Sequence, residues 1–135
     1  MLTKEKLISE KYVEVSYDDA TKVVEADWKG YLKLQQVEAG CSVISDAIRQ
    51  RDITRHLSDH TELKVLSKEV QTYLTQTWFP HVADLGLKKI AVLVSLDVFA
   101  QATVNKVNSE SHVQVADLTI RTFMNKKECM EWLNE

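Results

Sequence analysis

The sequence predicts one α/β domain in which helices pack on a mixed β-sheet of about five strands. Two observations carry this prediction. Residues 13–28 contain two segments in which apolar and polar side chains alternate, as in a hairpin with one buried face. Residues 88–95, KKIAVLVS, include an unbroken apolar run, which indicates a strand buried on both faces within a parallel sheet. The expected order is therefore an N-terminal hairpin followed by parallel βαβ units.

The composition narrows the classes of function. The 135 residues suit a single domain over residues 1–135, and the hydrophobic fraction of 44% supports an ordered core. The net charge of −3 argues against a general nucleic-acid binder, which needs a concentrated basic face. No apolar run approaches the ~20 residues that span a bilayer, and the first residues, MLTKEKLISEKY, are too polar for a signal peptide. We therefore expect a cytoplasmic protein without a membrane span.

The hairpin and the first helix follow from side-chain periodicity. The residues expected to face the core of the hairpin are Val13, Val15, Tyr17, Val24, Ala26 and Trp28. Gly30 ends the second strand, and a helix from about Lys33 to Arg51 follows, with apolar residues at steps of three and four. Gly40 lies inside this helix, where it would allow close packing against the sheet. Cys41 and Cys129 lie on apolar helical stripes, which predicts buried reduced thiols.

The segment of residues 53–67, ITRHLSDHTELKVLS, is less regular. It has one firm apolar anchor, Leu57, among polar neighbours. An interior strand that left several polar side chains unpaired would lose ~1–3 kcal/mol for each. We therefore predict a short strand, Ile53–Ser58, with His56 near the margin of the sheet. The strand gives way at Asp59 to an exposed loop that extends to Leu66.

The second half of the chain continues the α/β alternation. Ser67 is expected to cap a second helix. Pro80 is not tolerated in a helix interior, so a kink or break is expected near Trp78 and Phe79, and Gly86 is expected to end that helix. After the strand in KKIAVLVS, the remaining elements are a helix over residues 98–107, a strand over residues 118–123 and a last helix capped by Asn125 and Glu128.

Four stretches together resemble a known class of proteins. They are WKG at residues 28–30, LSDH at 57–60, LTQTWFPHVADLGLKKIAVLVS at 74–95 and TIRTFMNKKECMEWLNE at 119–135. Their order resembles the small bacterial proteins of the STAS-like class, which are related in fold to anti-sigma-factor antagonists and grouped loosely with CRAL-TRIO lipid-binding domains. The resemblance covers nearly the whole chain and implies a single STAS-like domain. Many members have no assigned activity, so it implies more about fold than about function.

The resemblance also suggests a position for a phosphoswitch. Anti-sigma-factor antagonists carry a phosphorylatable Ser, in an Asp-x-Ser context, at the start of the helix after a central strand. The corresponding place here is SDHTEL, where Asp59 matches the Asp and Thr61 stands in place of the Ser. The rest of the pattern of that switch is missing. The resemblance therefore leaves open whether Thr61 or a nearby Ser is phosphorylated.

Two groups of residues are candidates for a site. Asp59, His60 and Thr61 should lie at the carboxyl edge of the sheet, where α/β proteins bind ligands. They could contact a partner protein or bind an anion, or Asp59 and Thr61 could cap local backbone groups. Trp78 and Phe79 could line an apolar pocket, or they could belong to the core.

We expect a non-enzymatic regulatory or protein-binding module of the STAS-like type, with a small apolar-ligand or lipid carrier as the alternative. A weaker third interpretation is a hydrolase or transferase that uses His60 with Asp59. The sequence has no nucleophile elbow and no glycine-rich phosphate loop, and its four histidines show no metal-ligand spacing, so we expect no cofactor and no metal. A protein partner and a homodimer are both possible, the latter because small α/β proteins often form two-fold dimers.

Overall fold

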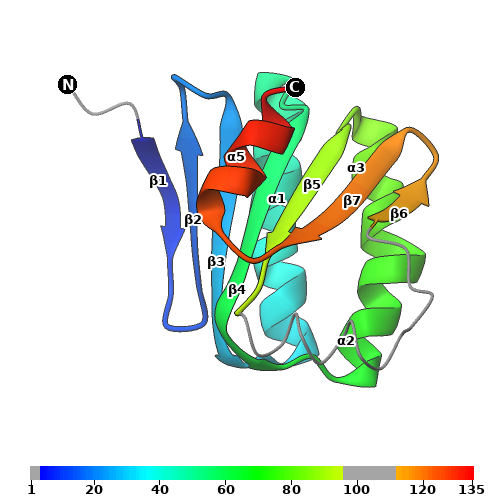
Figure 1. The fold of residues 1–135 in the computed structure, drawn as a ribbon. Helices are drawn as coiled ribbons and strands as arrows, with labels where there is room; N and C mark the ends of the chain where they lie inside the picture. The colour runs from blue at the N-terminus through cyan, green and yellow to red at the C-terminus, as the bar shows by residue number, and fades with distance from the viewer. Residues whose placement is uncertain (1–3, 96–111) are drawn as a thin grey trace.

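The computed structural model describes residues 4–95 and 112–135 and shows a mixed sheet with helices on both faces (Figure 1). Within these residues the sheet has seven strands, in the order β1-β2-β3-β4-β5-β7-β6. The strands are β1 (Lys4–Ser9), β2 (Val13–Asp18), β3 (Val23–Tyr31), β4 (Arg55–Val65), β5 (Lys89–Leu93), β6 (His112–Val115) and β7 (Leu118–Phe123). β3, β4, β5 and β7 run parallel, and antiparallel strands flank them on both sides.

The helices form one layer on each face of the sheet. They are α1 (Leu34–Arg51), α2 (Lys68–Tyr73), a π-helical turn η1 (Leu74–Trp78), α3 (Phe79–Leu85) and α5 (Lys126–Leu133). Figure 1 shows α5 on one face and α1 with the α2–α3 segment on the other. The larger apolar core lies under α1 and the α2–α3 segment, and a smaller one lies under α5.

The hairpin and the central strand confirm the sequence pattern. β2 and β3 pair antiparallel, with Val15 opposite Ala26, and these two residues join the larger core. β5 lies between β4 and β7 and runs parallel to both. Ile90 is buried on one face of β5, and Ala91 and Leu93 are buried on the other. The prediction of an interior strand without a wet face is therefore confirmed.

Helix α1 approaches the sheet closely at Gly40. An added Cβ at this position would lie 2.5 Å from Cη2 of Trp28, so only glycine lets the helix and β3 come this near. The stripe of α1 that faces the sheet is buried and includes Val37, Cys41, Ile44 and Ile48. At the start of the helix, the backbone N–H of Lys33 donates a hydrogen bond of 2.9 Å to Oε1 of Gln36.

The helical segment after β4 continues through a π-helical turn instead of breaking. Ser67 caps its start, because its hydroxyl oxygen accepts a hydrogen bond from the backbone N–H of Val70 at 3.2 Å. The π-helical turn precedes Pro80, which lies in the first turn of α3 and has no N–H to donate. Gly86 ends α3 with a φ of 108°, a conformation that favours glycine. The irregularity predicted near Trp78 is therefore present as a widened helical turn.

The last helix covers the other face of the sheet. Asn125 caps it through a side-chain oxygen that accepts a hydrogen bond from the backbone N–H of Glu128 at 2.8 Å, as the sequence predicts. Trp132 and Leu133 are buried there in a cluster with Phe123 of β7. Both cysteines of the chain are buried and free, which confirms that expectation.

The sheet has more strands than the five that the sequence predicts. β1 pairs with β2 at one edge, and β6 pairs with β7 at the other. β1, KEKLIS, is mostly exposed, and β6, HVQV, has only four residues, so neither shows a clear alternation. Both are edge strands held mainly by the backbone ladder of one neighbour. The helix predicted over residues 98–107 lies outside the described residues.

The prediction of a short strand with a loop after Ser58 is wrong. β4 continues through the predicted loop for eleven residues in all. It reaches this length because β3 runs beside it in parallel pairing to the end of both strands, with two register shifts. The polar side chains that suggested a loop satisfy one another within the strand: Ser58 contacts His60, and Thr61 contacts Asp59.

Candidate functional site

Side-chain alternation along β4 separates its polar residues into two groups. His56, Ser58 and His60 face the layer of α1, α2 and α3, where they line a pocket. Asp59 projects from the opposite face, because successive residues of a strand point to opposite sides, and Thr61 is hydrogen-bonded to it there. The three residues proposed from the sequence as one partner-binding group therefore do not lie together, since His60 is separated from the other two by the sheet.

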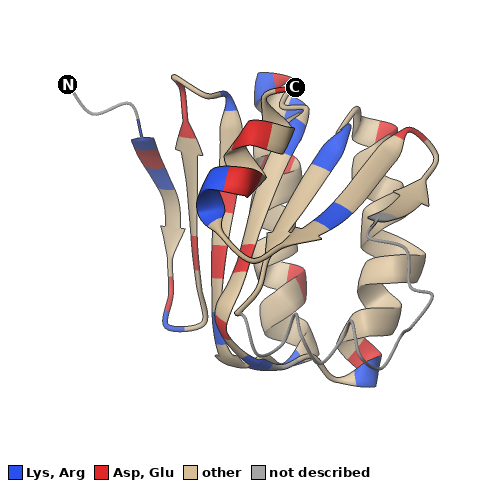
Figure 2. Cartoon of the chain, viewed as in Figure 1, with Lys and Arg blue, Asp and Glu red and all other residues tan. Residues whose placement is uncertain are grey.

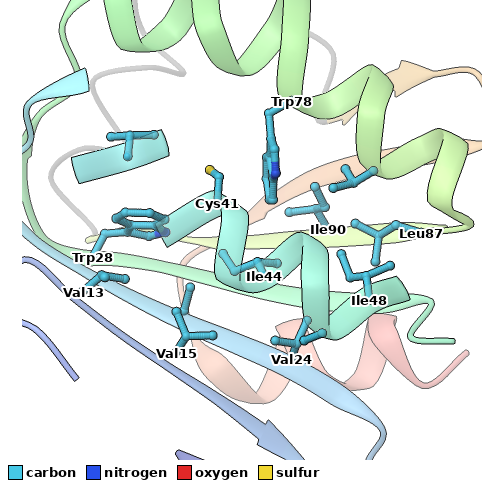
Figure 3. Close-up of a cluster of buried hydrophobic side chains, with 14 of the residues drawn as sticks. Val13, Val15, Val24, Trp28, Cys41, Ile44, Ile48, Trp78, Leu87 and Ile90 are labelled. Carbon is cyan, nitrogen blue, oxygen red and sulfur yellow. The ribbon is translucent and has the colours of Figure 1, made fainter. Parts of the chain in front are cut away.

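The pocket lies between the sheet and the helices and is almost entirely apolar. Its volume is about 40 Å³. Trp78 and Phe79, the pair proposed from the sequence as a pocket lining, both border it. Figure 3 shows Trp78 reaching from the helical segment toward the sheet, with Cys41 and Ile90 on either side. The aromatic pair thus belongs to the core and to the pocket at once.

Differences in burial show where the pocket opens. Lining residues such as His56 of β4 and Ile90 of β5 are almost fully buried and mark its closed end. Leu63, Leu66 and Leu74 also line it but are only half-buried. These leucines therefore mark an apolar mouth between the end of β4 and the helical segment that follows it.

His56 is a buried, neutral imidazole. It is 1% exposed, and its Nδ1 lies 2.8 Å from the backbone carbonyl oxygen of Val24. Because a carbonyl oxygen can only accept, Nδ1 carries the ring hydrogen and Nε2 is unprotonated. Burial lowers the pKa of His56 to about 4, although the Val24 carbonyl and Glu25 act in the opposite direction. The ring meets Trp78 edge-on, with the ring centroids 6.0 Å apart.

Ser58 and His60 form a hydrogen-bonded pair in the same pocket. Oγ of Ser58 lies 2.8 Å from Nε2 of His60. Burial lowers the pKa of His60 to about 4, and the nearby His56 lowers it further while Asp59 raises it. The imidazole is therefore neutral at pH 7, and its tautomer decides whether Nε2 donates to the hydroxyl or accepts from it. Ser58 and His60 therefore give the pocket an uncharged pair of groups that can donate and accept hydrogen bonds.

A polar contact fixes the ring of Trp78. Its indole N–H donates a hydrogen bond of 2.9 Å to Oγ of Ser45 on α1, and both residues are buried. Trp78 is the last residue of the π-helical turn, a feature that occurs frequently at functional sites. The indole is therefore held against the pocket from two helices.

On the opposite face of β4, Asp59 and Thr61 satisfy each other. Oδ1 of Asp59 accepts hydrogen bonds from the backbone N–H of Thr61 at 2.9 Å and from its hydroxyl at 2.7 Å. This is the local capping arrangement that stood as the alternative to a partner contact. Asp59 also pairs in register with Asp27 on β3, and Asp27 with Glu14 on β2. These three residues form an acidic row across the part of the sheet that α5 leaves open (Figure 2).

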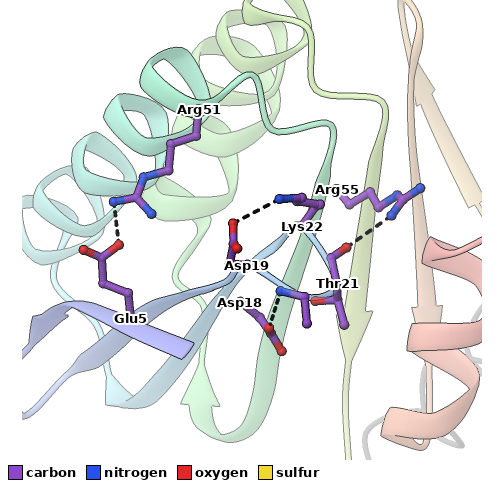
Figure 4. Close-up of polar contacts among 8 residues, drawn as sticks. Glu5, Asp18, Asp19, Thr21, Lys22, Arg51 and Arg55 are labelled. Atoms are coloured by element: carbon purple, nitrogen blue, oxygen red, sulfur yellow. Dashed lines mark hydrogen bonds and ion pairs between the residues drawn. The ribbon is translucent and has the colours of Figure 1, made fainter. Parts of the chain in front are cut away.

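A second hollow lies where α1 ends and β4 begins, and it contains three cations. Its volume is about 370 Å³. The cations and their partners are Lys22 with Asp19 at 3.0 Å, Arg51 with Glu5, and Arg55 with the carbonyl oxygen of Thr21 at 3.2 Å (Figure 4). Because each cation already has a partner, an anion would have to compete for them. The hollow is therefore a weaker candidate than the pocket.

The described residues contain no metal-binding cluster, since no three His, Cys, Asp or Glu side chains among them come together in a suitable group. In the same part of the chain, no helix has the length and apolar character needed to cross a membrane.

Comparisons with known proteins inform the fold. The sequence matches no protein-family model, and no curated protein matches it. Among solved structures, it is similar to the crystal structure of an uncharacterized protein from the DUF3478 family with a SpoIIAA-like fold, from Shewanella loihica PV-4. The two share 18% sequence identity with a TM-score of 0.54, and the match covers 96% of this chain and 91% of the other.

The fold is SpoIIAA-like. This confirms the STAS-like architecture that the sequence suggested. At 18% identity the likeness concerns the fold alone. The function of this SpoIIAA-like protein must therefore be argued from its own residues.

Sequence reasoning found only part of the pocket. It selected His60, Trp78 and Phe79 but grouped His60 with residues on the other face. It does not find His56 or Ser58, because it places His56 at the sheet margin and Ser58 at the end of a short strand. The available signal was the spacing of two residues between His56, Ser58 and His60, which places all three on one face of a strand.

Proposed function

We propose that this protein is a non-enzymatic binding module of the SpoIIAA-like type, and that its site is the pocket between β4 and the helices. The ligand is a small, largely apolar molecule. The observation that supports this most strongly is a row of three polar side chains, His56, Ser58 and His60, against otherwise apolar walls. Small-molecule sites combine mostly apolar linings with a few placed polar groups in this way.

The state of the histidines supports binding over catalysis. A general base works best when its pKa lies near the operating pH. The pKa of both His56 and His60 is lowered to about 4, so both imidazoles are weak bases at pH 7. Asp59 is on the other face of the sheet and cannot orient His60 as the acid of a triad would.

The size of the pocket limits how a ligand lies in it. Drug-sized ligands occupy sites of ~300–1,000 Å³, and the volume of this pocket is about 40 Å³. A ligand must therefore place only one end inside and the rest in the mouth lined by Leu63, Leu66 and Leu74. This geometry fits a slender apolar molecule that binds end-on.

Titration with 1-octanol, a slender apolar probe, tests the proposal. Binding should raise the melting temperature and shift the NMR signals of the Trp78 indole N–H. Leu63→Glu, which places a charge in the mouth, should weaken binding at least tenfold, about 1.4 kcal/mol. Leu7→Glu is the matched control, because Leu7 is a half-buried strand leucine that does not line the pocket. Equal affinities for the two variants would place the site elsewhere.

A second candidate is the protein-binding role first suggested by Asp59. It is favoured by the acidic row of Glu14, Asp27 and Asp59 on the open face of the sheet, where an atom of Asp27, Oδ1, is buried without a hydrogen-bond partner among the described residues. Glu14 already pairs with Lys6 at 3.3 Å, and a basic segment of a partner would supply further positive charge beside Asp27 and Asp59. Chemical-shift mapping with a lysine-rich peptide tests this, and shifts confined to the pocket would reject it.

A further inference from the structure

We propose that the ligand is an uncharged alcohol, whose hydroxyl group enters the pocket beside Ser58 and His60 while its apolar chain lies in the mouth. This inference rests on the proposed binding function and specifies the chemistry of the ligand. It follows from the charge of the pocket, its hydrogen-bonding groups and its size.

The pocket has no charged lining. None of the fifteen residues that line it is Asp, Glu, Lys or Arg. Its three polar side chains are one hydroxyl and two imidazoles, and the imidazoles are neutral because burial opposes their protonation. A carboxylate or an ammonium group placed there would lose its hydration without gaining a countercharge. A charged head group is therefore excluded from the position beside these polar groups.

The polar groups of the pocket match a hydroxyl in particular. The unprotonated Nε2 of His56 can only accept a hydrogen bond, so it suits a ligand that donates one. The pair of Ser58 and His60 uses one hydrogen for its own bond of 2.8 Å, and the serine oxygen keeps a further lone pair or its own hydrogen, depending on the tautomer of His60. A hydroxyl both donates and accepts, so it can serve both partners. An ether or a ketone can only accept.

The volume of the pocket limits how much of the ligand it can hold. A water-sized group needs at least ~10–15 Å³ of such volume, so about 40 Å³ holds roughly three groups of that size. The hydroxyl and the first carbon atoms of a chain fill this space. The remaining carbons then lie against the half-buried Leu63, Leu66 and Leu74. A terminal alcohol on an unbranched chain fits both parts of the site.

A set of probes with the same chain tests the head group. The dissociation constants of 1-octanol, octanoate, octylammonium and heptyl methyl ether are measured at pH 7.5 by NMR titration of the full-length protein. We expect 1-octanol to bind roughly tenfold more tightly than each of the others, the difference that one hydrogen bond in a buried site can supply. If octanoate, octylammonium or the ether bound as tightly as the alcohol, the inference would be overturned while the proposed function stood. If none of the four bound, the proposed function would fall with it.

A variant of Ser58 tests the contact itself. In Ser58→Ala, the preference for 1-octanol over the ether should fall to about threefold or less, because one hydrogen-bonding partner of the hydroxyl is lost. Ser16→Ala is the matched control, a serine on β2 that does not line the pocket, and it should keep the preference. If Ser58→Ala weakened the binding of alcohol and ether equally, the serine would act only through packing. That result would overturn the contact, and the melting temperature of each variant shows whether it is folded.

Discussion

The carboxylates of Asp27 and Asp59 stand side by side on the adjacent parallel strands β3 and β4, in direct register. Burial raises the pKa of Asp27, and the negative charge of Asp59 raises it further. A raised pKa in the folded state means that the charged form is destabilising, so folding stability falls as the pH rises through the range between the unfolded and folded pKa values. The two neighbouring carboxylates therefore lower the stability of the folded protein at neutral pH.

Replacing Asp27 with Asn should therefore stabilise the protein at pH 7 by about 0.5–1 kcal/mol, since like charges directly opposite each other on neighbouring strands are destabilising by that order. The gain should shrink as the pH is lowered through the folded pKa of Asp27. Urea unfolding at several pH values measures it. Asp84→Asn, the same change at an exposed helical position, should have little effect. A loss of stability in Asp27→Asn would show that the carboxylate makes a favourable contact.

Acid should destabilise the protein through His56. Its pKa is lowered to about 4 in the folded state from an ordinary value of 6.5, so the folded protein favours the neutral ring. The full stability is present above pH 6.5 and is lost as the pH falls from 6.5 to about 4, by up to ~3 kcal/mol from this residue.

The pH dependence of urea unfolding, measured for the protein and for His56→Gln, checks this prediction. The variant should be less stable at pH 7 but should lose less stability between pH 6.5 and pH 4. His81→Gln is the control, because His81 is an exposed histidine on α3 and its removal should leave the acid dependence unchanged. Parallel curves for the protein and His56→Gln would contradict a buried neutral imidazole.

The parts of the fold that the sequence predicts are those in which each local pattern has a single explanation. The alternation of β2 and β3, the stripe of α1 and the apolar run of β5 all report burial directly. β1 and β6 escape prediction because an edge strand is stabilised by backbone pairing with a neighbour, which leaves little trace in its own side chains.

The site escapes prediction for a related reason. A polar residue in a strand predicts an exposed position unless its hydrogen-bond partner in the fold is known. His56 is instead paired with the carbonyl oxygen of Val24, thirty-two residues away in the chain, and Ser58 with His60. The alternation that puts these residues on one face is visible in the sequence, but the length of β4 is set by its ladder with β3. That tertiary contact decides which polar residues share a pocket.

Removing the ring of Trp132 should weaken the packing of α5 on the sheet. Trp132 is 7% exposed and packs on Phe123, with the ring centroids 5.6 Å apart. We expect Trp132→Ala to cost ~3–5 kcal/mol in the free energy of unfolding, as for other buried aromatic residues. Trp132→Phe should cost less, because it keeps a ring in place. The hydrogen bond from Nζ of Lys89 goes to the backbone carbonyl of Trp132 and is retained in both. An unchanged melting curve for Trp132→Ala would show that α5 is peripheral.

The close approach of Gly40 to Trp28 predicts a coupled pair of mutations. Alanine is the better helix former by about 1 kcal/mol, but its Cβ at Gly40 would lie 2.5 Å from Cη2 of Trp28. We expect the clash to prevail, so that Gly40→Ala lowers the free energy of unfolding by about 1–3 kcal/mol.

The same substitution should have the opposite sign when the obstructing atoms are absent. In a Trp28→Phe background, which lacks the outer atoms of the indole, Gly40→Ala should be neutral or stabilising by up to ~1 kcal/mol, because helix propensity then decides. Urea unfolding of the four proteins of this double-mutant cycle measures the coupling between the two sites. Ser42→Ala, on the exposed side of the same helix, controls for propensity alone. Equal losses from Gly40→Ala in both backgrounds would mean that contact with the indole is not what requires glycine at this position.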